Sequence, residues 1–246
     1  MEIRGCTVVV SGGCGGLGLP IATYLHEMGA RVVIVDRDTE ALEALPACFG
    51  RRLADLSVPE ETKKAAHSIA EEYGAPDVLV NAAGFIISEP LVNIFNTESI
   101  VLDYKNFRLG LAANLDSVFT MTSSVVEEMI RSRRKGVIIS LSSICACGNE
   151  GQTVYSAAKA AVNAMTVTWA KELGRFGIRC NAVAPGFIDT ESTRKALTES
   201  QLKHIVENTP LRRLGTPFEI AKAITALIEN DFLTGLVFPV DGGIRL

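Results

Sequence analysis

The sequence predicts a single α/β domain: a doubly wound, seven-stranded parallel sheet with helices on both faces. Two observations lead to this prediction. Short β-branched runs alternate with helical patterns from one end of the chain to the other, which is typical of parallel strands joined by helical crossovers. The runs are continuously apolar, as expected for strands that are covered on both faces. The 246 residues contain no repeat or linker tract, so residues 1–246 are predicted to form one domain.

The elements follow from local pattern. Leu17, Ile21, Leu25 and Met28 form an apolar helical repeat that ends at Gly29, a suitable residue for a helix C-terminus. Further helices are predicted over 59–73, 115–134, 155–174 and 217–229. The predicted strands are 7–10, 31–36, 52–54, 78–81, 137–141, 179–184 and 237–240.

Composition narrows the function classes. Apolar residues make up 48% and charged residues 21%, as in an ordinary globular protein. The formal net charge of −4 offers no basic surface for nucleic acid or an anionic membrane. The sequence shows no run long enough for a signal peptide or a membrane span, which favours the cytoplasm. With no Cys-x-x-Cys pair and only 3 scattered His, we expect no metal site.

A glycine-rich segment, Ser11-Gly-Gly-Cys-Gly-Gly-Leu-Gly18, lies between the first predicted strand and the first helix. Glycines allow the backbone to turn sharply and approach a pyrophosphate, and the free N–H groups at a helix start favour an anion. Such a segment alone could be an ordinary tight turn, but the strand–turn–helix context favours dinucleotide binding. Its predicted contact residues are Gly12, Gly16, Leu17 and Gly18.

Asp36 ends the second predicted strand, 18 residues after Gly18. A carboxylate there would accept hydrogen bonds from the adenosine ribose hydroxyls and repel a 2′-phosphate, which favours NAD over NADP. Arg37 is adjacent and could weaken that exclusion. The alternative is that Asp36 is simply a solvated acid at a strand end.

The segment from Ser142 to Lys159 predicts proton chemistry. Tyr155 and Lys159 are four residues apart, so a helix would place them on one face, one turn apart. A phenol has a pKa of ~10, and a nearby ammonium should lower it toward neutral pH. Ser142, thirteen residues before Tyr155, ends an apolar run and could hold a substrate oxygen. The alternative is a helix that contains Tyr-x-x-x-Lys by chance.

Six motifs in register resemble those of the short-chain dehydrogenase/reductase family, and the resemblance covers essentially the whole chain. They are S-G-G-C-G-G-L-G (11–18), N-A-A-G (81–84), Asn114, Ser142, Y-S-A-A-K (155–159) and P-G-F-I-D-T (185–190), followed by L-T-G (233–235) and V-D-G-G (240–243). The resemblance implies a Rossmann domain that binds a nicotinamide dinucleotide. Where many members have N-N-A-G, this chain has N-A-A-G, so contacts from a second Asn are absent.

The resemblance also implies roles for individual residues. Tyr155 would be the general acid in reduction and the base in oxidation, with Lys159 lowering its pKa and binding the nicotinamide ribose. Ser142 would orient the substrate oxygen, the thirteen-residue offset selecting it over Ser143, and Asn114 would hold a water in a proton relay. The implied cofactor contacts beyond the glycine loop are Asp36, Asp55, Leu56, Asn81, Gly84, Tyr155, Lys159, Pro185, Ile188 and Thr190.

The sequence gives less information on the substrate and on the oligomeric state than on the cofactor. Residues 190–216 are expected to form a mobile lid, and the expected pocket walls are Phe85, Ile144, Cys145, Gln152 and Phe187. A neutral, apolar small molecule is the expected substrate, although the basic pairs 194–195 and 212–213 could contact a carrier phosphate. Family members usually form homotetramers through the helices predicted at 115–134 and 155–174.

These observations predict an NAD(H)-dependent oxidoreductase that interconverts a secondary alcohol and a ketone. The long segment between Gly84 and Asn114 and the compact loop before 233–235 resemble the branch that oxidises hydroxyacyl thioesters and hydroxysteroids. A 3-oxoacyl-carrier-protein reductase is the alternative, but such enzymes normally prefer NADPH, and Asp36 counts against it. A non-catalytic dinucleotide-sensing scaffold is the alternative of another class.

Overall fold

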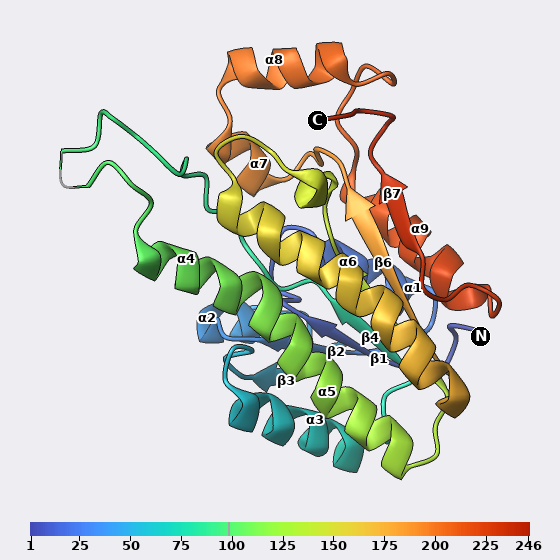
Figure 1. The fold of residues 1–246 in the computed structure, drawn as a ribbon. Coiled ribbons are helices and arrows are strands. Elements are labelled where there is room, and N and C mark those ends of the chain that lie inside the picture. The colour runs from blue at the N-terminus through green and yellow to red at the C-terminus, as the bar shows by residue number, and fades with distance from the viewer. Residues whose placement is uncertain (98) are drawn as a thin grey trace.

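The computed structural model describes residues 1–97 and 99–246. Its centre is one parallel sheet of seven strands in the order β3-β2-β1-β4-β5-β6-β7 (Figure 1), which confirms the predicted fold class. The strands are β1 (Thr7–Ser11), β2 (Arg31–Asp36), β3 (Gly50–Leu53), β4 (Val78–Asn81), β5 (Gly136–Leu141), β6 (Ile178–Pro185) and β7 (Val237–Val240).

The strand order reverses between β1 and β4, and this reversal positions the site. The chain winds outward from β1 to β3 and then returns to β4 on the other side of β1. Ser11 and Asn81 are paired at the carboxyl ends of these two strands. Connections at such a switch point leave in opposite directions, so a crevice opens beyond the strand ends where ligands bind.

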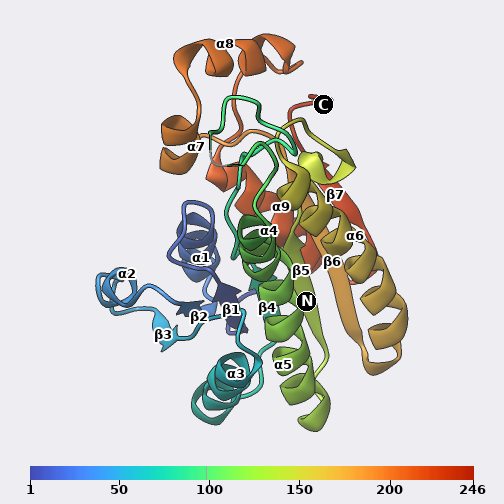
Figure 2. The same ribbon diagram turned by 60° about the vertical axis from the view of Figure 1, so that its left-hand side comes forward.

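Helices cover both faces of the sheet (Figure 2). On one face α1 (Gly18–Glu27) packs beside α9 (Pro217–Glu229). On the other face lie α3 (Pro59–Tyr73), α5 (Ser117–Arg131) and α6 (Thr153–Leu173). Each face has its own apolar core, because the strand side chains alternate between the two layers.

The five predicted helices are confirmed, and the described residues form further short helices that were not predicted. These are α2 (Thr39–Glu43), α4 (Tyr104–Leu111), α7 (Glu191–Ala196) and α8 (Glu199–Asn208). They are too short or too exposed to show a sustained apolar repeat. Of these, α8 carries the clearest local signal, the reciprocal capping box between Thr198 and Gln201.

Two boundaries differ from prediction in ways that affect the site. β3 begins at Gly50 rather than at residue 52. Arg51 and Arg52 are charged, so a search for apolar runs does not find the start of this edge strand. The helix predicted from residue 115 is preceded by a π-helical turn, Ala112–Asp116, that joins α4 to α5. Within the described residues, no helix is long and apolar enough to cross a membrane.

Candidate active site

The glycine loop leaves β1 and enters α1 at the switch point. Gly12 has a φ of +66°, and its N–H donates to the Val35 carbonyl at 2.8 Å. A Cβ on Gly12 would collide with the Cα of Ala83, and a Cβ on Gly18 would collide with the Gly12 carbonyl. Glycine is therefore required by close backbone approach at both positions, and the loop closes against the segment that follows β4.

Asp36 lies against this loop. One carboxylate oxygen accepts from the Cys14 N–H at 3.0 Å, and the other accepts from the Arg37 N–H at 2.8 Å. Burial and the neighbouring Asp36 carboxylate raise the pKa of the Cys14 thiol to about 12, so the thiol remains protonated. The acid thus sits where the loop and the end of β2 meet, the position at which an adenosine ribose would be recognised.

The segment after β6 closes the other side of the crevice. A Cβ on Gly16 would lie 3.4 Å from the Cβ of Thr190, so the glycine loop and residue 190 are neighbours in space. The Thr190 hydroxyl caps α7 by accepting from the Thr193 N–H at 3.2 Å. Pro185 ends β6, and the buried Ile188 is bridged to Gly215. The two ends of the expected dinucleotide site are therefore brought together.

Other predicted contact residues have structural partners. The Asn81 side chain donates to Thr122 at 2.9 Å and to Ser140 at 3.2 Å, which ties β4 to α5 and β5. The Asp55 carboxylate accepts from the Ser57 hydroxyl and N–H, and these bonds lower its pKa. Leu56 is buried. Asn81 and Leu56 therefore stabilise the fold, whereas Asp55 is partly exposed near the end of β3.

Tyr155 and Lys159 lie on one face of α6, as predicted. The Lys159 ammonium is 5.5 Å from the centre of the Tyr155 ring and donates to the Leu141 carbonyl at 2.8 Å. Burial lowers the pKa of Lys159 to about 8. The pKa of Tyr155 is raised to about 12, because burial and the nearby Cys145 disfavour the phenolate while a hydrogen bond with Ser143 partly opposes them.

This result corrects one expectation. The pKa of Tyr155 lies above its ordinary value rather than below it, because burial and the nearby Cys145 raise it. A phenol with a raised pKa keeps its proton at neutral pH and can donate it, which suits reduction of a carbonyl. The pair therefore consists of a protonated acid beside an amine that titrates near pH 8.

The two serines after β5 differ in their contacts. The Ser142 hydroxyl donates to the Lys159 carbonyl at 3.4 Å, so it lies against α6 at Lys159. The Ser143 hydroxyl accepts from the Cys145 N–H at 3.1 Å, and Ser143 partly opposes the rise in the pKa of Tyr155. Ser142 also pairs with β6 through its N–H. Its role in holding the substrate oxygen stays a prediction.

Asn114 occupies the π-helical turn between α4 and α5. Its Nδ2 donates to the Phe85 carbonyl at 2.8 Å and to the Gly110 carbonyl at 3.0 Å. Its buried Oδ1 has no hydrogen-bond partner within the described residues. A Cβ on Gly84 would collide with this oxygen and lie 3.6 Å from the Lys159 ammonium nitrogen. Asn114 thus presents an unsatisfied acceptor near Lys159, and π-helical turns are frequent at functional sites.

The predicted pocket walls are only partly assembled. Cys145 is buried and contributes to the pKa of Tyr155. Gln152 precedes α6 and has a buried Oε1 with no partner among the described residues. Ile144 and Phe187 are partly buried, and Phe85 is 37% exposed. Cys145, Gln152 and Phe85 each adjoin a catalytic candidate.

Three of the four basic residues considered for a carrier phosphate are already paired with carboxylates, and the Arg212 guanidinium donates to the Glu207 carbonyl. Arg194 makes two bonds to the Asp189 carboxylate at 2.6 and 2.7 Å. Lys195 pairs with Glu191 at 2.6 Å. Arg213 pairs with Glu219, and the Arg213 guanidinium lowers the pKa of that carboxyl to about 2. These pairs favour a solvated charged surface over a phosphate site.

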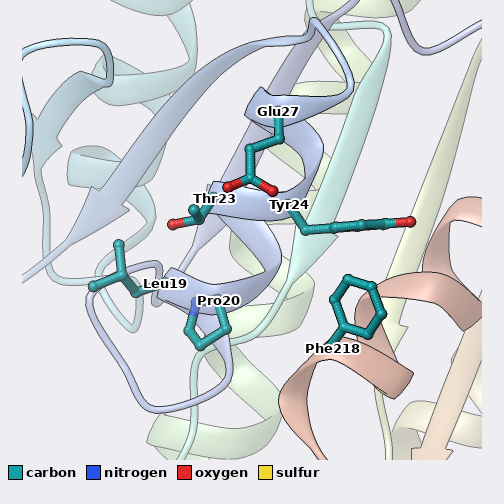
Figure 3. Close-up of a pocket in the computed structure, with 6 residues that line it drawn as sticks. All are labelled: Leu19, Pro20, Thr23, Tyr24, Glu27 and Phe218. Atoms are coloured by element: carbon teal, nitrogen blue, oxygen red, sulfur yellow. The ribbon is translucent and has the colours of Figure 1, made fainter.

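A surface pocket lies outside this constellation. It measures about 310 Å³ and lies between α1 and α9, where the rings of Tyr24 and Phe218 meet edge to face at 5.0 Å (Figure 3). Its lining is Leu19, Pro20, Thr23, Tyr24, Glu27 and Phe218. None of the predicted catalytic residues lines this pocket, so the candidate active site is identified by their side chains and not by the pocket. In the described part of the chain, no group of three His, Cys, Asp or Glu could hold a metal.

Comparison with known proteins agrees with this geometry. A family model of short-chain dehydrogenases, described as "Enoyl-(Acyl carrier protein) reductase", matches residues 12–245. The 3-oxoacyl-[acyl-carrier-protein] reductase FabG of Thermotoga maritima is 35% identical, covering 99% of both chains. The chain belongs to the short-chain dehydrogenase/reductase family. It is an oxidoreductase of the alcohol–ketone type, and members of this family bind a nicotinamide dinucleotide.

Two further relatives widen the range of substrates seen among short-chain dehydrogenases. The (3R)-3-hydroxyacyl-CoA dehydrogenase of Canis lupus familiaris is 32% identical, over 100% of this chain and 98% of that protein. The ligand-free aldohexose dehydrogenase of Thermoplasma acidophilum has a TM-score of 0.87 at 28% identity, covering 98% of this chain and 94% of that one. The fold is thus common to relatives that act on acyl thioesters and on sugars.

The residues present fit a dinucleotide. The glycine loop leaves room that a Cβ would fill, Asp36 lies at the loop, and Thr190 faces Gly16 across the crevice. The unsatisfied Asn114 oxygen provides an acceptor beside Lys159. Sequence reasoning missed the Leu141 carbonyl that holds Lys159, and no local pattern reveals this contact between β5 and α6.

Proposed function

We propose that this protein interconverts a 3-hydroxyacyl thioester and its 3-oxoacyl counterpart, with NAD(H) as the hydride carrier. The observation that carries the chemistry is the grouping of Ser142, Tyr155 and Lys159 at the carboxyl end of β5. The relatives named as acting on 3-oxoacyl and 3-hydroxyacyl substrates support the thioester class.

The residues divide the work as follows. The glycine loop, Asp36 and Thr190 would hold a nicotinamide dinucleotide, which would supply the hydride in reduction and take it back in oxidation. Ser142 donates a hydrogen bond to the substrate oxygen and fixes its direction. Tyr155 donates its phenolic proton to that oxygen in reduction and takes the proton back in the reverse reaction. Lys159 titrates near pH 8 and, with Asn114 beside it, restores the Tyr155 proton.

Preference for NAD over NADP rests on Asp36. Its carboxylate is fixed by the N–H groups of Cys14 and Arg37, so it cannot easily turn away from a ribose phosphate. Two negative charges brought to ~4 Å near a protein surface repel by about 4 kcal/mol. Arg37 is adjacent and reduces this repulsion.

The test is the rate of acetoacetyl-CoA reduction with NADH and with NADPH. We expect kcat/KM to favour NADH by at least about tenfold, and Asp36→Ser to narrow that preference by a similar factor. Asp38→Ser, which removes the carboxylate that caps α2, is the matched control. A preference for NADPH would reject the NAD assignment, and the alternative, an NADPH-dependent 3-oxoacyl-carrier-protein reductase, would then replace it.

A panel of alcohols distinguishes the remaining substrate classes. Aldohexoses and hydroxysteroids are tested for NAD reduction beside 3-hydroxybutyryl-CoA. Faster turnover of an aldohexose would replace the thioester assignment with a sugar dehydrogenase. Turnover of no substrate, together with intact NADH binding, would favour the dinucleotide-sensing scaffold.

We further propose that the protein is a cytoplasmic homotetramer with a small-molecule substrate, and that it does not bind nucleic acid or membranes. The net charge of −4 supports the last part. Exposed apolar residues on α5 and α6, among them Phe119 and Val167, support association through these helices. We propose that residues 190–216, which include α7 and α8, act as the substrate lid.

A further inference from the structure

The segment between β4 and α4 forms an apolar arm, defined as residues 85–97 and 99–102. Its two sides pair as an antiparallel hairpin, with the Asn93 N–H bonded to the Ile100 carbonyl at 2.7 Å and the Leu102 N–H to the Leu91 carbonyl at 3.0 Å. Figure 1 shows it projecting from the N-terminal end of α4, away from the sheet. The arm has its own backbone pairing and does not merely connect two elements.

The surface of the arm is apolar. Its large apolar side chains with at least a third of their surface exposed are Phe85 (37%), Ile86 (53%), Leu91 (62%), Val92 (52%), Ile94 (73%), Phe95 (88%), Ile100 (53%) and Val101 (52%). In the sequence, Glu98 is the single charged residue from 91 to 102. An exposed apolar surface of this kind marks a binding site.

The root of the arm is attached to the candidate catalytic residues. The Phe85 carbonyl accepts the Asn114 side chain at 2.8 Å. Glu89 forms a backbone bridge with Gln152, three residues before Tyr155, and its carboxylate accepts from Asn106 at 2.9 Å. The exposed apolar surface therefore begins beside the site of chemistry and continues outward from it.

The helices α7 and α8 lie at the same end of the molecule as the root of the arm in both ribbon views (Figures 1 and 2). The cations of α7 are engaged in the ion pairs Arg194–Asp189 and Lys195–Glu191. This end of the molecule thus combines exposed apolar side chains with cations that are already paired, which suits an alkyl chain better than a polyol or a free carboxylate.

We propose that the apolar arm is a subsite for the alkyl chain of the substrate, so that long-chain 3-oxoacyl thioesters are preferred over acetoacetyl thioesters. The proposal rests on the function proposed above. In this proposal the reacting oxygen lies at Ser142 and Tyr155, and the alkyl chain extends past Phe85 toward Val92 and Phe95. Removal of each methylene from water favours binding about fourfold, so a chain that reaches the arm should outweigh the polar contacts of a short substrate.

The test compares kcat/KM for acetoacetyl-CoA and 3-oxododecanoyl-CoA. In the unaltered protein we expect the longer substrate to be favoured by at least about tenfold. Phe95→Ser and Val92→Ser should each lower that preference about fivefold or more and change kcat/KM for acetoacetyl-CoA by less than about twofold. Both side chains are exposed, so the fold should tolerate either change.

The matched control is Phe232→Ser. Phe232 is 98% exposed in the loop between α9 and β7, which Figure 1 places on the side of the molecule away from the arm. It should leave the chain-length preference unchanged. Equal use of both substrates by the unaltered protein, or an equal effect of Phe232→Ser and Phe95→Ser, would overturn the proposal.

Two further measurements distinguish an alkyl subsite from a contact between copies of the chain. Calorimetric titration with dodecanoyl-CoA and butyryl-CoA tests the subsite without turnover. If Phe95→Ser weakens the binding of dodecanoyl-CoA and leaves that of butyryl-CoA unchanged, the alkyl subsite is supported even if the protein does not catalyse the proposed reaction. Molecular mass in solution is measured for each variant. A change in mass with no change in chain-length preference would show that the arm contacts a second copy of the chain, and would reject the alkyl subsite.

Discussion

Ser142 and Ser143 are neighbours in sequence with different contacts. Ser142 continues the pairing with β6 and turns its hydroxyl to the Lys159 carbonyl of α6, whereas Ser143 accepts from the Cys145 N–H. The thirteen-residue offset to Tyr155 selects Ser142 for the substrate oxygen. The two serines should therefore respond differently to the same substitution.

Ser142→Ala should lower kcat for ketone reduction by about 10²-fold, because one donor to the reacting oxygen is lost. Ser143→Ala should change kcat by less than about threefold and act mainly on stability, since it removes the acceptor of the Cys145 N–H. Steady-state kinetics of the two variants provide the comparison. The reverse order of effects would move the role to Ser143.

Lys159 makes stability depend on pH. Burial lowers its pKa from 10.5 to about 8. Between these values the unfolded chain holds a proton that the folded protein lacks, so the free energy of unfolding rises with pH. From pH ~8 to pH ~10, the difference in unfolding free energy between the unaltered protein and Lys159→Met should grow by about 2 kcal/mol in urea titrations. A flat difference would mean that the pKa of Lys159 is not lowered.

At the scale of elements, the π-helical turn joins α4 to α5 and places Asn114 beside Gly84. The sequence predicted one helix from residue 115, because the apolar repeat continues through the turn without interruption. Asn inside a helical pattern was the available signal of an irregularity. The turn itself follows from contacts distant in sequence, chiefly the bond from Asn114 to Phe85, which no local pattern reveals.

Gly84→Ala tests this arrangement. An added Cβ would collide with the Asn114 Oδ1, and a φ of +143° disfavours any other residue. We expect kcat to fall about tenfold or more as Asn114 is displaced. Gly74→Ala is the matched control, because it shares a positive φ of +81° but has open space around its Cβ position. Equal kcat in the two variants would remove Asn114 from the proton relay.

The same scale shows what sequence could predict. Six strands, the second half of β3 and the five predicted helices follow from apolar runs, and the glycine loop, Asp36, Tyr155 and Lys159 follow from motif spacing. The pKa of Tyr155 could not be predicted, since it depends on burial and on Cys145. The hairpin of the apolar arm was also missed, because its exposed strands do not alternate between apolar and polar residues.

At the scale of the whole molecule, the sheet brings together residues from opposite ends of the chain. Reversal of strand order between β1 and β4 places the glycine loop near Thr190, and β5 leads to Ser142 at the same edge. Exposed apolar side chains gather on the outer surfaces of α5 and α6 and on the apolar arm. We assign the first region to assembly and the second to substrate.

The proposed homotetramer predicts the molecular mass of the protein in solution. Sedimentation equilibrium should give roughly four times the chain mass of 26.3 kDa. Phe119 is 53% exposed on α5, and Phe119→Asp should reduce the mass, because a charge would be buried in the contact. A monomeric unaltered protein, or a tetramer unaffected by this change, would place the contact elsewhere.

The central claim is that Tyr155 exchanges a proton with the substrate oxygen during hydride transfer. The direct measurement is kcat/KM for acetoacetyl-CoA reduction by NADH in Tyr155→Phe, with Tyr24→Phe in the pocket between α1 and α9 as the matched control. We expect Tyr155→Phe to lose about 10³-fold and the control to retain normal activity. A Tyr155→Phe protein that turns over within about threefold of the unaltered protein would contradict the claim.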